Sequence, residues 1–254
     1  MVERDHRPGV AHFFCNEPLL SPGALVLGED AAHHARVRRL AVGAPVTVRD
    51  GTGTAASGTL VRMAKQHLEL EIASPRCPPL LPAVHLMVPV ADKERMLLVA
   101  EKATELAVTT WRPVLWRRSK SVAGRGEGPM FAQKVEARMI SALLQSEGAW
   151  LPQRFMESSA ERAIAALPGD GTRLVLDPEG EPMLGVTVTA PVVLAIGPEG
   201  GFEPDEMQRL LDSGFRRVAI AGGILRMETA AIVALGIVRS QLAATTTCTG
   251  ASDE

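Results

Sequence analysis

The sequence lacks the features that mark secreted, metal-binding or membrane-spanning proteins. Its three cysteines, Cys15, Cys77 and Cys248, are far apart, and no Cys-x-x-Cys pair occurs. This spacing indicates neither a disulfide framework nor a zinc site, so we expect free thiols and no metal. No apolar run reaches the roughly 18 residues that span a bilayer, and the N-terminus lacks the apolar segment of a signal peptide. We therefore expect a cytoplasmic protein without membrane contact.

Phosphate-binding motifs and a strong net charge are missing as well. The sequence contains no Gly-x-x-x-x-Gly-Lys-Ser/Thr, and no Gly-x-Gly-x-x-Gly follows a predicted strand. Nucleotide hydrolases and dinucleotide-binding enzymes need such phosphate cradles, so both classes are disfavoured. The formal net charge is only −2. A protein that binds nucleic acid over its whole surface would be basic, so any contact with RNA must be local.

A proline-rich stretch divides the chain. Four prolines fall within residues 75–82, which excludes a helix or a central strand and predicts a linker. Before it, residues 45–49, 57–62 and 67–72 predict short antiparallel strands around a turn, Asp50-Gly51-Thr52-Gly53. We expect residues 11–74 to form a small β-barrel, preceded by an extension over residues 1–10.

Strands and helices alternate after the linker, which predicts a parallel sheet within an α/β domain over residues 83–243. Ser159 is a candidate N-cap. We expect residues 244–254 to form a flexible tail. The predicted strands cover residues 84–90, 109–116, 173–176, 192–196 and 218–220, and the predicted helices cover residues 92–107, 131–144, 158–167, 204–211 and 229–243.

Two unusual loops follow neighbouring predicted strands. The first is Ile196-Gly197-Pro198-Glu199-Gly200-Gly201-Phe202, and the second contains Ile224-Leu225-Arg226-Met227-Glu228-Thr229-Ala230-Ala231. Glycine-rich loops let a small molecule approach main-chain N–H and C=O groups directly. Because the carboxyl ends of parallel strands meet at one crevice, we expect both loops to line the same pocket, with Arg226 and Glu228 at its rim.

Two clusters of basic residues are candidates for phosphate contacts. Residues 112–125 hold five positive charges and no acidic residue, and a second cluster lies at residues 34–39. Arginine and lysine supply salt-dependent affinity for RNA, although an ordinary solvated surface is the alternative. The candidate RNA-binding residues are Arg36, Arg38, Arg39, Arg117, Arg118 and Lys120.

Taken together, these segments resemble the SPOUT methyltransferases, specifically the RsmE family, which methylates N3 of a uridine in small-subunit ribosomal RNA. The two signature loops carry most of the resemblance. Further similarity lies in Asp92-Lys93-Glu94-Arg95 with residues 101–106, in Leu176-Asp177-Pro178-Glu179-Gly180, and in the N-terminal residues 33–53. Recognisable segments cover most of the chain.

The resemblance implies a trefoil-knotted α/β domain that binds S-adenosylmethionine, a PUA-like RNA-binding barrel before it, and a homodimer. The partner would be ribosomal RNA or the small ribosomal subunit. The resemblance further implies that the cofactor contacts Leu176, Gly197, Glu199, Gly200, Ile220, Gly222, Ile224 and Leu225.

The chemistry of N3 methylation suggests catalytic roles for two residues. Uridine N3 becomes nucleophilic as its proton leaves, which builds negative charge on the ring carbonyls. The guanidinium of Arg226 would stabilise that charge, since arginine stays protonated in proteins. Glu228 or Glu199 would accept the proton or orient Arg226.

Two other functions remain open. Two charged positions of the family are replaced here, the Glu of a Glu-Gln pair by Leu144 and a following arginine by Gly148, and Gly223 stands where another arginine is usual. These positions surround the substrate more than the cofactor. The chain could therefore methylate another RNA, or it could be a ribosome-assembly factor that binds RNA without catalysis.

Overall fold

The computed structural model describes residues 10–119, 126–220 and 223–249 of the 254-residue chain. Its contacts divide the chain into two compact units, Met1–Leu80 with Leu143–Leu151, and Leu81–Ala142 with Pro152–Glu254. The boundary near Leu80 falls within the predicted linker. Residues 143–151, which the sequence analysis assigned to the second domain, belong by their contacts to the first unit.

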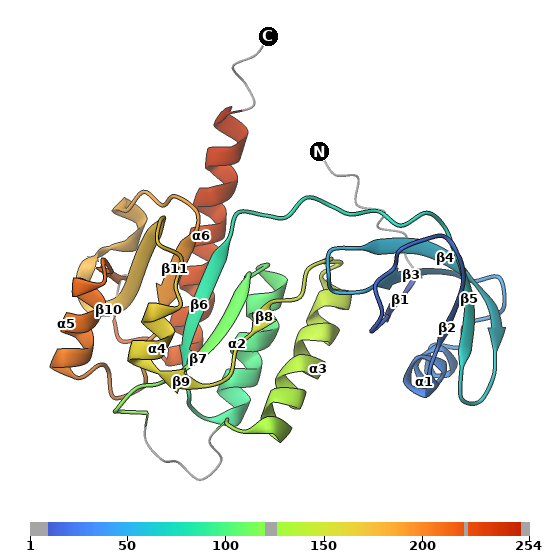
Figure 1. Cartoon of the computed structure of the whole chain (residues 1–254), viewed down its shortest axis with the longest axis horizontal. Helices are drawn as coiled ribbons and strands as arrows, with labels where there is room; N and C mark the ends of the chain where they lie inside the picture. Colours follow the sequence, from blue (N-terminus) through green and yellow to red (C-terminus); the bar gives the residue numbers. More distant parts are fainter. Residues whose placement is uncertain (1–9, 120–125, 221–222, 250–254) are drawn as a thin grey trace. The chain divides into compact units, whose positions relative to one another are not determined.

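A five-stranded, barrel-like sheet forms the N-terminal unit, in the order β1-β3-β4-β5-β2 (Figure 1). Strand β1 pairs in parallel with β3, and the other pairs are antiparallel. Helix α1 packs on the sheet through Ala32 and Ala35. The predicted strands β3, β4 and β5 are confirmed. Its elements are β1 (Ala11–Phe14), β2 (Gly23–Leu27), α1 (Glu29–Val37), β3 (Pro45–Arg49), β4 (Ala55–Met63) and β5 (Leu68–Ile72).

The Asp-Gly-Thr-Gly turn explains why residues 143–151 belong to this unit. The N–H of Gly53 donates to Ala149 O at 2.9 Å, and the N–H of Leu151 donates to Gly51 O at 2.8 Å. The indole of Trp150 lies so close to Gly53 that a Cβ there would be 2.2 Å from its Cζ2 atom. Gly53 also has a φ of 108°, so glycine is required at this position.

Seven strands form a parallel sheet in the C-terminal unit, in the order β12-β10-β11-β6-β7-β8, with β9 also paired to β7 (Figure 1). Every pair in this sheet is parallel, as the alternating sequence pattern predicted. The elements are β6 (Val84–Pro89), α2 (Lys93–Glu105), β7 (Thr110–Leu115), α3 (Pro129–Gln145), β8 (Gln153–Arg154), β9 (Ser158–Ser159), α4 (Ala160–Ala165), β10 (Thr172–Pro182), η1 (Met183–Gly185), β11 (Val192–Ala195), α5 (Pro204–Asp212), β12 (Arg216–Ala219) and α6 (Met227–Thr249).

Helices cover both faces of this sheet. On one face, Ala160 of α4 and Leu210 of α5 pack against the sheet residues Met87, Val175 and Val193. On the other face, α2 and α6 contact each other (Figure 1). The α/β fold class predicted from the sequence is therefore confirmed, whereas the knotted path of the chain stays a prediction.

Helix α6 begins at Met227 and extends past the predicted end at residue 243 to Thr249. By length and composition alone, its segment Met227–Ala244 could cross a membrane, and within the described part of the chain it is the only such segment. Its residues Ala231, Leu235 and Val238 are fully buried, and the helix contacts α2. We therefore interpret α6 as a helix of the core of this unit.

Strand β10 is longer than the predicted residues 173–176. Both Leu176 and Glu181 pair with Val218 of β12, so the four residues between them loop out of the ladder. The chain then rejoins β12 through Pro182 and Ala219. Pro178 and Gly180 interrupt the apolar pattern after Leu176, so periodicity alone does not find the continuation of the strand. This bulge projects polar residues at the carboxyl end of the sheet.

Candidate functional site

A cavity of about 1020 Å³ lies at the carboxyl ends of β10, β11 and β12. Its walls include the β10 bulge at residues 176–179, the loop after β11 at residues 196–202, and residues 223–227 before α6. Helix α5, the end of strand β12, and the side chains of Arg95 and Arg118 also line the cavity. The two loops that the sequence analysis singled out therefore meet, as expected for the edge of a parallel sheet.

Most of the residues predicted to contact a cofactor line this cavity. They are Leu176, Gly197, Glu199, Ile220, Ile224 and Leu225. Gly200 belongs to the same loop but is not part of the lining, and its carbonyl accepts a hydrogen bond from Arg118. Gly222 lies outside the described residues.

The cavity combines bare backbone with exposed apolar side chains. Ile224 is 91% exposed and Leu225 is 36% exposed, although both are large hydrophobic residues. At Gly197, an added Cβ would lie 2.8 Å from the ring of Phe202, which itself packs edge-on against Trp116 with centroids 4.8 Å apart. The loop after β11 therefore rests on an aromatic support and presents its backbone to the cavity.

Four arginines line the cavity, and three of them are paired with carboxylates. Arg95 pairs with Glu199. Arg118 makes a bidentate pair with Glu203, with distances of 2.8 and 3.2 Å. Arg217 Nε donates to Asp177 Oδ2 at 2.9 Å and its Nη2 to Glu179 Oε2 at 2.8 Å, and these hydrogen bonds raise the pKa of Arg217.

Arg226 is the exception. Its side chain is exposed at the cavity wall, and among the described residues no carboxylate forms an ion pair with it. A guanidinium without an anionic partner keeps its positive charge and its donors available for a ligand. Arg226 is therefore the cation of this cavity that is best placed to meet negative charge.

Glu228 is buried rather than displayed in the cavity. It is 9% exposed, and its Oε1 atom lies 3.9 Å from Nε of Arg95. Its Oε2 atom has no hydrogen-bond partner among the described residues. The expectation that Glu228 orients Arg226 has no contact to support it, because the carboxylate faces Arg95 instead. Arg95 thus links Glu228 to Glu199.

Arg95 was not predicted as a site residue, although a local signal was present. Asp92 caps helix α2, since its Oδ1 atom accepts from the N–H groups of Glu94 at 3.0 Å and Arg95 at 3.2 Å. This cap fixes the first turn of α2 directly after β6. Recognising Asp92 as the N-cap would have placed Arg95 at the carboxyl end of β6, beside the cavity.

The basic residues predicted to bind RNA fall into distinct settings. Arg36 donates to the carbonyls of Ala64 and Lys65, at 3.2 and 2.7 Å, and so ties α1 to the turn between β4 and β5. Arg38 and Arg39 are exposed directly after α1. Lys120 lies outside the described residues.

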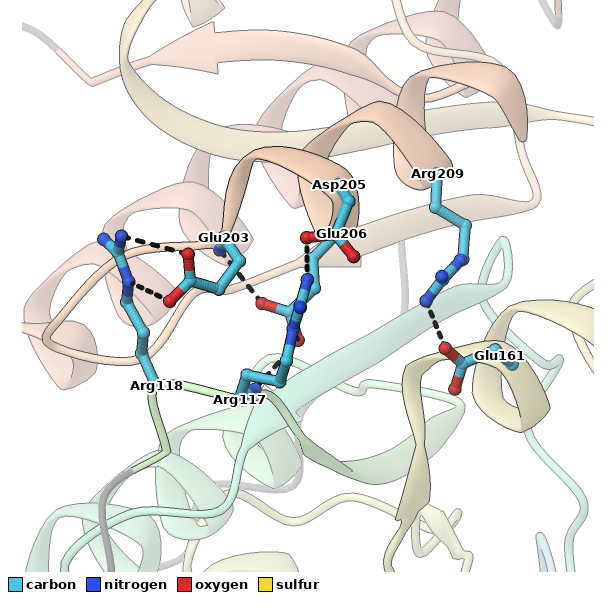
Figure 2. Close-up of polar contacts among 7 residues, drawn as sticks. All are labelled: Arg117, Arg118, Glu161, Glu203, Asp205, Glu206 and Arg209. Atoms are coloured by element: carbon cyan, nitrogen blue, oxygen red, sulfur yellow. Dashed lines mark hydrogen bonds and ion pairs between the residues drawn. The ribbon is translucent and has the colours of Figure 1, made fainter.

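Arg117 and Arg118 both face the start of helix α5 (Figure 2). Arg117 pairs with Asp205, and Arg118 pairs with Glu203. The hydrogen bond from Arg118 lowers the pKa of Glu203, so both members of this pair are charged at neutral pH. The positive charges predicted to contact phosphates are thus compensated within this unit.

Comparison with known families identifies both parts of the chain. The profile of an RNA methyltransferase domain matches residues 79–239, and the profile of an RNA methyltransferase PUA domain matches residues 27–73. The chain is 28% identical over 247 residues to the ribosomal RNA small subunit methyltransferase E of Mycobacterium bovis, covering 90% of this chain and 91% of that protein. A protein of the same name from Synechocystis is 28% identical over 151 residues, which cover 57% of this chain and 48% of that protein.

Solved structures show the same fold. A ribosomal RNA small subunit methyltransferase E from Neisseria gonorrhoeae, bound to S-adenosylmethionine, superposes with a TM-score of 0.81 at 24% identity, covering 91% of this chain and 97% of that one. A probable rRNA-methyltransferase from Porphyromonas gingivalis superposes with a TM-score of 0.79 at 24% identity, covering 93% and 100% of the two chains.

Proposed function

Because the chain belongs to the RNA methyltransferase family and to its RsmE branch, we propose that it methylates N3 of a uridine in small-subunit ribosomal RNA, with S-adenosylmethionine as the methyl donor. The observation that carries this proposal is the composition of the cavity. Backbone loops and exposed apolar residues form its wall, and Arg226 is its one arginine without an ion pair among the described residues.

The cavity suits S-adenosylmethionine. An adenine ring needs apolar contacts together with main-chain donors and acceptors, which Ile224, Leu225 and the loop at residues 197–201 offer. The carboxylates of Asp177, Glu179 and Glu199 at the same wall are already paired with Arg217 and Arg95, so the apolar and main-chain contacts carry this part of the proposal. When bound, the cofactor would supply an electrophilic methyl group. We assign its binding to Leu176, Gly197, Glu199, Gly200, Ile220, Gly222, Ile224 and Leu225.

Arg226 would act on the acceptor base. Loss of the N3 proton places negative charge on the uracil carbonyls, and a guanidinium that donates hydrogen bonds to them stabilises such charge. Arginine keeps its own proton, so it contributes charge and hydrogen bonds rather than proton transfer. In this role Arg226 favours loss of the N3 proton and so promotes formation of the nucleophilic anion.

We propose that Glu199, which lines the cavity, accepts the N3 proton. Glu228 influences this step only through Arg95, which pairs with both carboxylates. Arg95 contacts both carboxylates and holds Glu199 in place. Glu228 balances the charge of Arg95 from its buried side. In this arrangement Glu228 contributes to catalysis indirectly, because its carboxylate does not line the cavity.

The function is tested by incubating the protein with isotopically labelled S-adenosylmethionine and unmodified small ribosomal subunits. The RNA is then digested and its nucleosides are identified by mass spectrometry. Labelled N3-methyluridine is the expected product. A different labelled nucleoside would favour the alternative of another RNA target. Gly223 suggests this alternative, because it lies at the cavity wall where the family usually has an arginine. Absence of label despite RNA binding would indicate a ribosome-assembly factor without catalysis.

The N-terminal barrel, residues 11–74, is the proposed RNA-binding domain, with Arg38 and Arg39 as its exposed phosphate contacts. Replacing both with alanine should reduce the slope of log affinity against log salt by roughly 0.7–0.9 per arginine. Filter binding with small-subunit RNA at several salt concentrations measures this slope. The control is Arg62→Ala, since Arg62 is exposed in the same unit but pairs with Glu69. An unchanged slope in the double variant would contradict the assignment.

We also propose a cytoplasmic homodimer, with the small ribosomal subunit or its RNA as partner. Val233 on α6 is 38% exposed, and Gly236 and Ile237 beside it are half-buried, which leaves a small apolar face on this helix. Introducing a charge there by Val233→Glu should convert the dimer to a monomer, because burying a carboxylate without a partner is costly. Light scattering coupled to size exclusion measures the mass. A monomeric parent protein would contradict the proposal.

A further inference from the structure

The segment after β7 is fastened to the start of α5 by both backbone and side chains (Figure 2). Glu206 is 3% exposed, and its two carboxylate oxygens accept from the N–H of Arg117 at 2.8 Å and from the N–H of Glu203 at 3.0 Å. The second bond is half of a capping box. A single buried carboxylate therefore holds two segments that are far apart in the sequence.

Arg118 extends this connection to the loop that follows β11. Its Nη1 atom donates to Gly200 O at 2.8 Å, while Nε and Nη2 bind the two oxygens of Glu203. The loop lies directly on the side chain, because a Cβ at Gly200 would be 3.2 Å from Cβ of Arg118. All three nitrogens of the guanidinium are thus engaged, two with a carboxylate and one with the glycine loop.

Helix α5 explains why cations gather here. Glu203 is its N-cap, and Asp205 and Glu206 lie in its first turn, where the helix dipole favours negative charge. Arg117 and Arg118 neutralise this cluster. An arginine that is held by a bidentate carboxylate has little charge left for a phosphate, whereas its planar shape fixes the groups it binds.

We propose that Arg118 is a positioning residue that holds the loop at residues 197–201 in the conformation that binds the cofactor. This inference rests on the proposed function. Arg118 acts through the Gly200 carbonyl and Glu203, so its contribution belongs to cofactor affinity rather than to RNA affinity or to the chemical step. A preformed loop binds more tightly because less ordering is needed when the ligand arrives.

The test measures binding of S-adenosylmethionine and of methylthioadenosine, which lacks the amino acid part, by calorimetry on the full chain. Arg118→Ala should weaken both ligands by a similar factor, about ten-fold or more, as expected for the loss of charge-assisted hydrogen bonds. Glu203→Gln should give a smaller loss, because the bond to Gly200 can remain. The rate at saturating cofactor and the Kd for RNA should stay near those of the parent protein.

Arg209→Ala is the matched control. Arg209 lies on α5, the helix whose start Arg118 contacts, and pairs with Glu161 (Figure 2). Neither Arg209 nor Glu161 lines the cavity. Equal cofactor affinity in the parent protein and Arg118→Ala would overturn the proposal. A loss confined to S-adenosylmethionine would overturn it too, since Arg118 would then bind the carboxylate of that ligand directly. A lower salt slope for RNA with unchanged cofactor affinity would make Arg118 a phosphate contact. If the parent protein binds neither ligand, the proposed function itself fails.

Discussion

Replacing Arg226 with alanine is expected to lower the rate of methyl transfer at saturating substrates by about 10²–10³-fold, the cost of removing one preorganised donor for a developing oxyanion. The affinity for S-adenosylmethionine should stay close to that of the parent protein. The reason is the setting of Arg226, which is exposed at the cavity wall and has no ion pair among the described residues, so its removal unbalances no carboxylate. Single-turnover assays with labelled cofactor measure the rate, and calorimetry measures the affinity.

Arg226→Lys separates charge from geometry. The lysine retains a positive charge but lacks the planar pair of donors, so we expect an intermediate rate. Arg216→Ala serves as a control, because Arg216 forms an exposed pair with Glu181 and does not line the cavity. If Arg226→Ala turned over at the parent rate, Arg226 would have no part in the chemistry. If the parent protein showed no turnover and Arg226→Ala lowered only the affinity for RNA, the non-catalytic alternative would gain support.

Replacing Arg239 with leucine is expected to destabilise the C-terminal unit by about 3 kcal/mol or more. Arg239 of α6 donates to three backbone carbonyls, at 2.7 Å to Leu106 O, at 2.5 Å to Pro82 O, and also to Ala107 O. Burial lowers its pKa to about 10, so the guanidinium remains protonated at neutral pH. Leucine would leave the carbonyls at the end of α2 without this donor, and each unsatisfied group costs about 1–3 kcal/mol.

Thermal unfolding checks this expectation. A loss of 3 kcal/mol corresponds to a decrease in Tm of about 6–12 °C for a unit of this size. Arg216→Leu is the matched control, because its exposed pair with Glu181 should contribute at most about 1 kcal/mol. Arg239→Lys should fall between them, since an ammonium can reach some of the carbonyls. Equal melting temperatures for Arg239→Leu and Arg216→Leu would show that water replaces the guanidinium without cost.

Local patterns in the sequence were sufficient for much of the fold. The apolar segments at residues 84–90 and 192–196 predicted the buried strands β6 and β11, and Ser159 was confirmed as the N-cap of α4, where its hydroxyl accepts from the N–H of Arg162. The glycine-rich loop after β11 also predicted a pocket at this edge of the sheet, where the structure has a cavity. These features depend on neighbours within a few residues, so periodicity and capping chemistry suffice to find them.

Tertiary structure decided which charges are available. The sequence suggested that Arg117 and Arg118 contact phosphates and that Arg226 meets the substrate, and only the folded chain shows that Asp205 and Glu203 pair with the first two. The same holds for Trp150, whose contact with Gly53 assigns residues 143–151 to the N-terminal unit. Ion pairs and packing between segments that are 85 or more residues apart leave no periodic signal in the chain. The ion pairs around the cavity arise because the parallel sheet brings the ends of distant strands to one edge, and there the partners of each arginine determine whether it can meet a substrate.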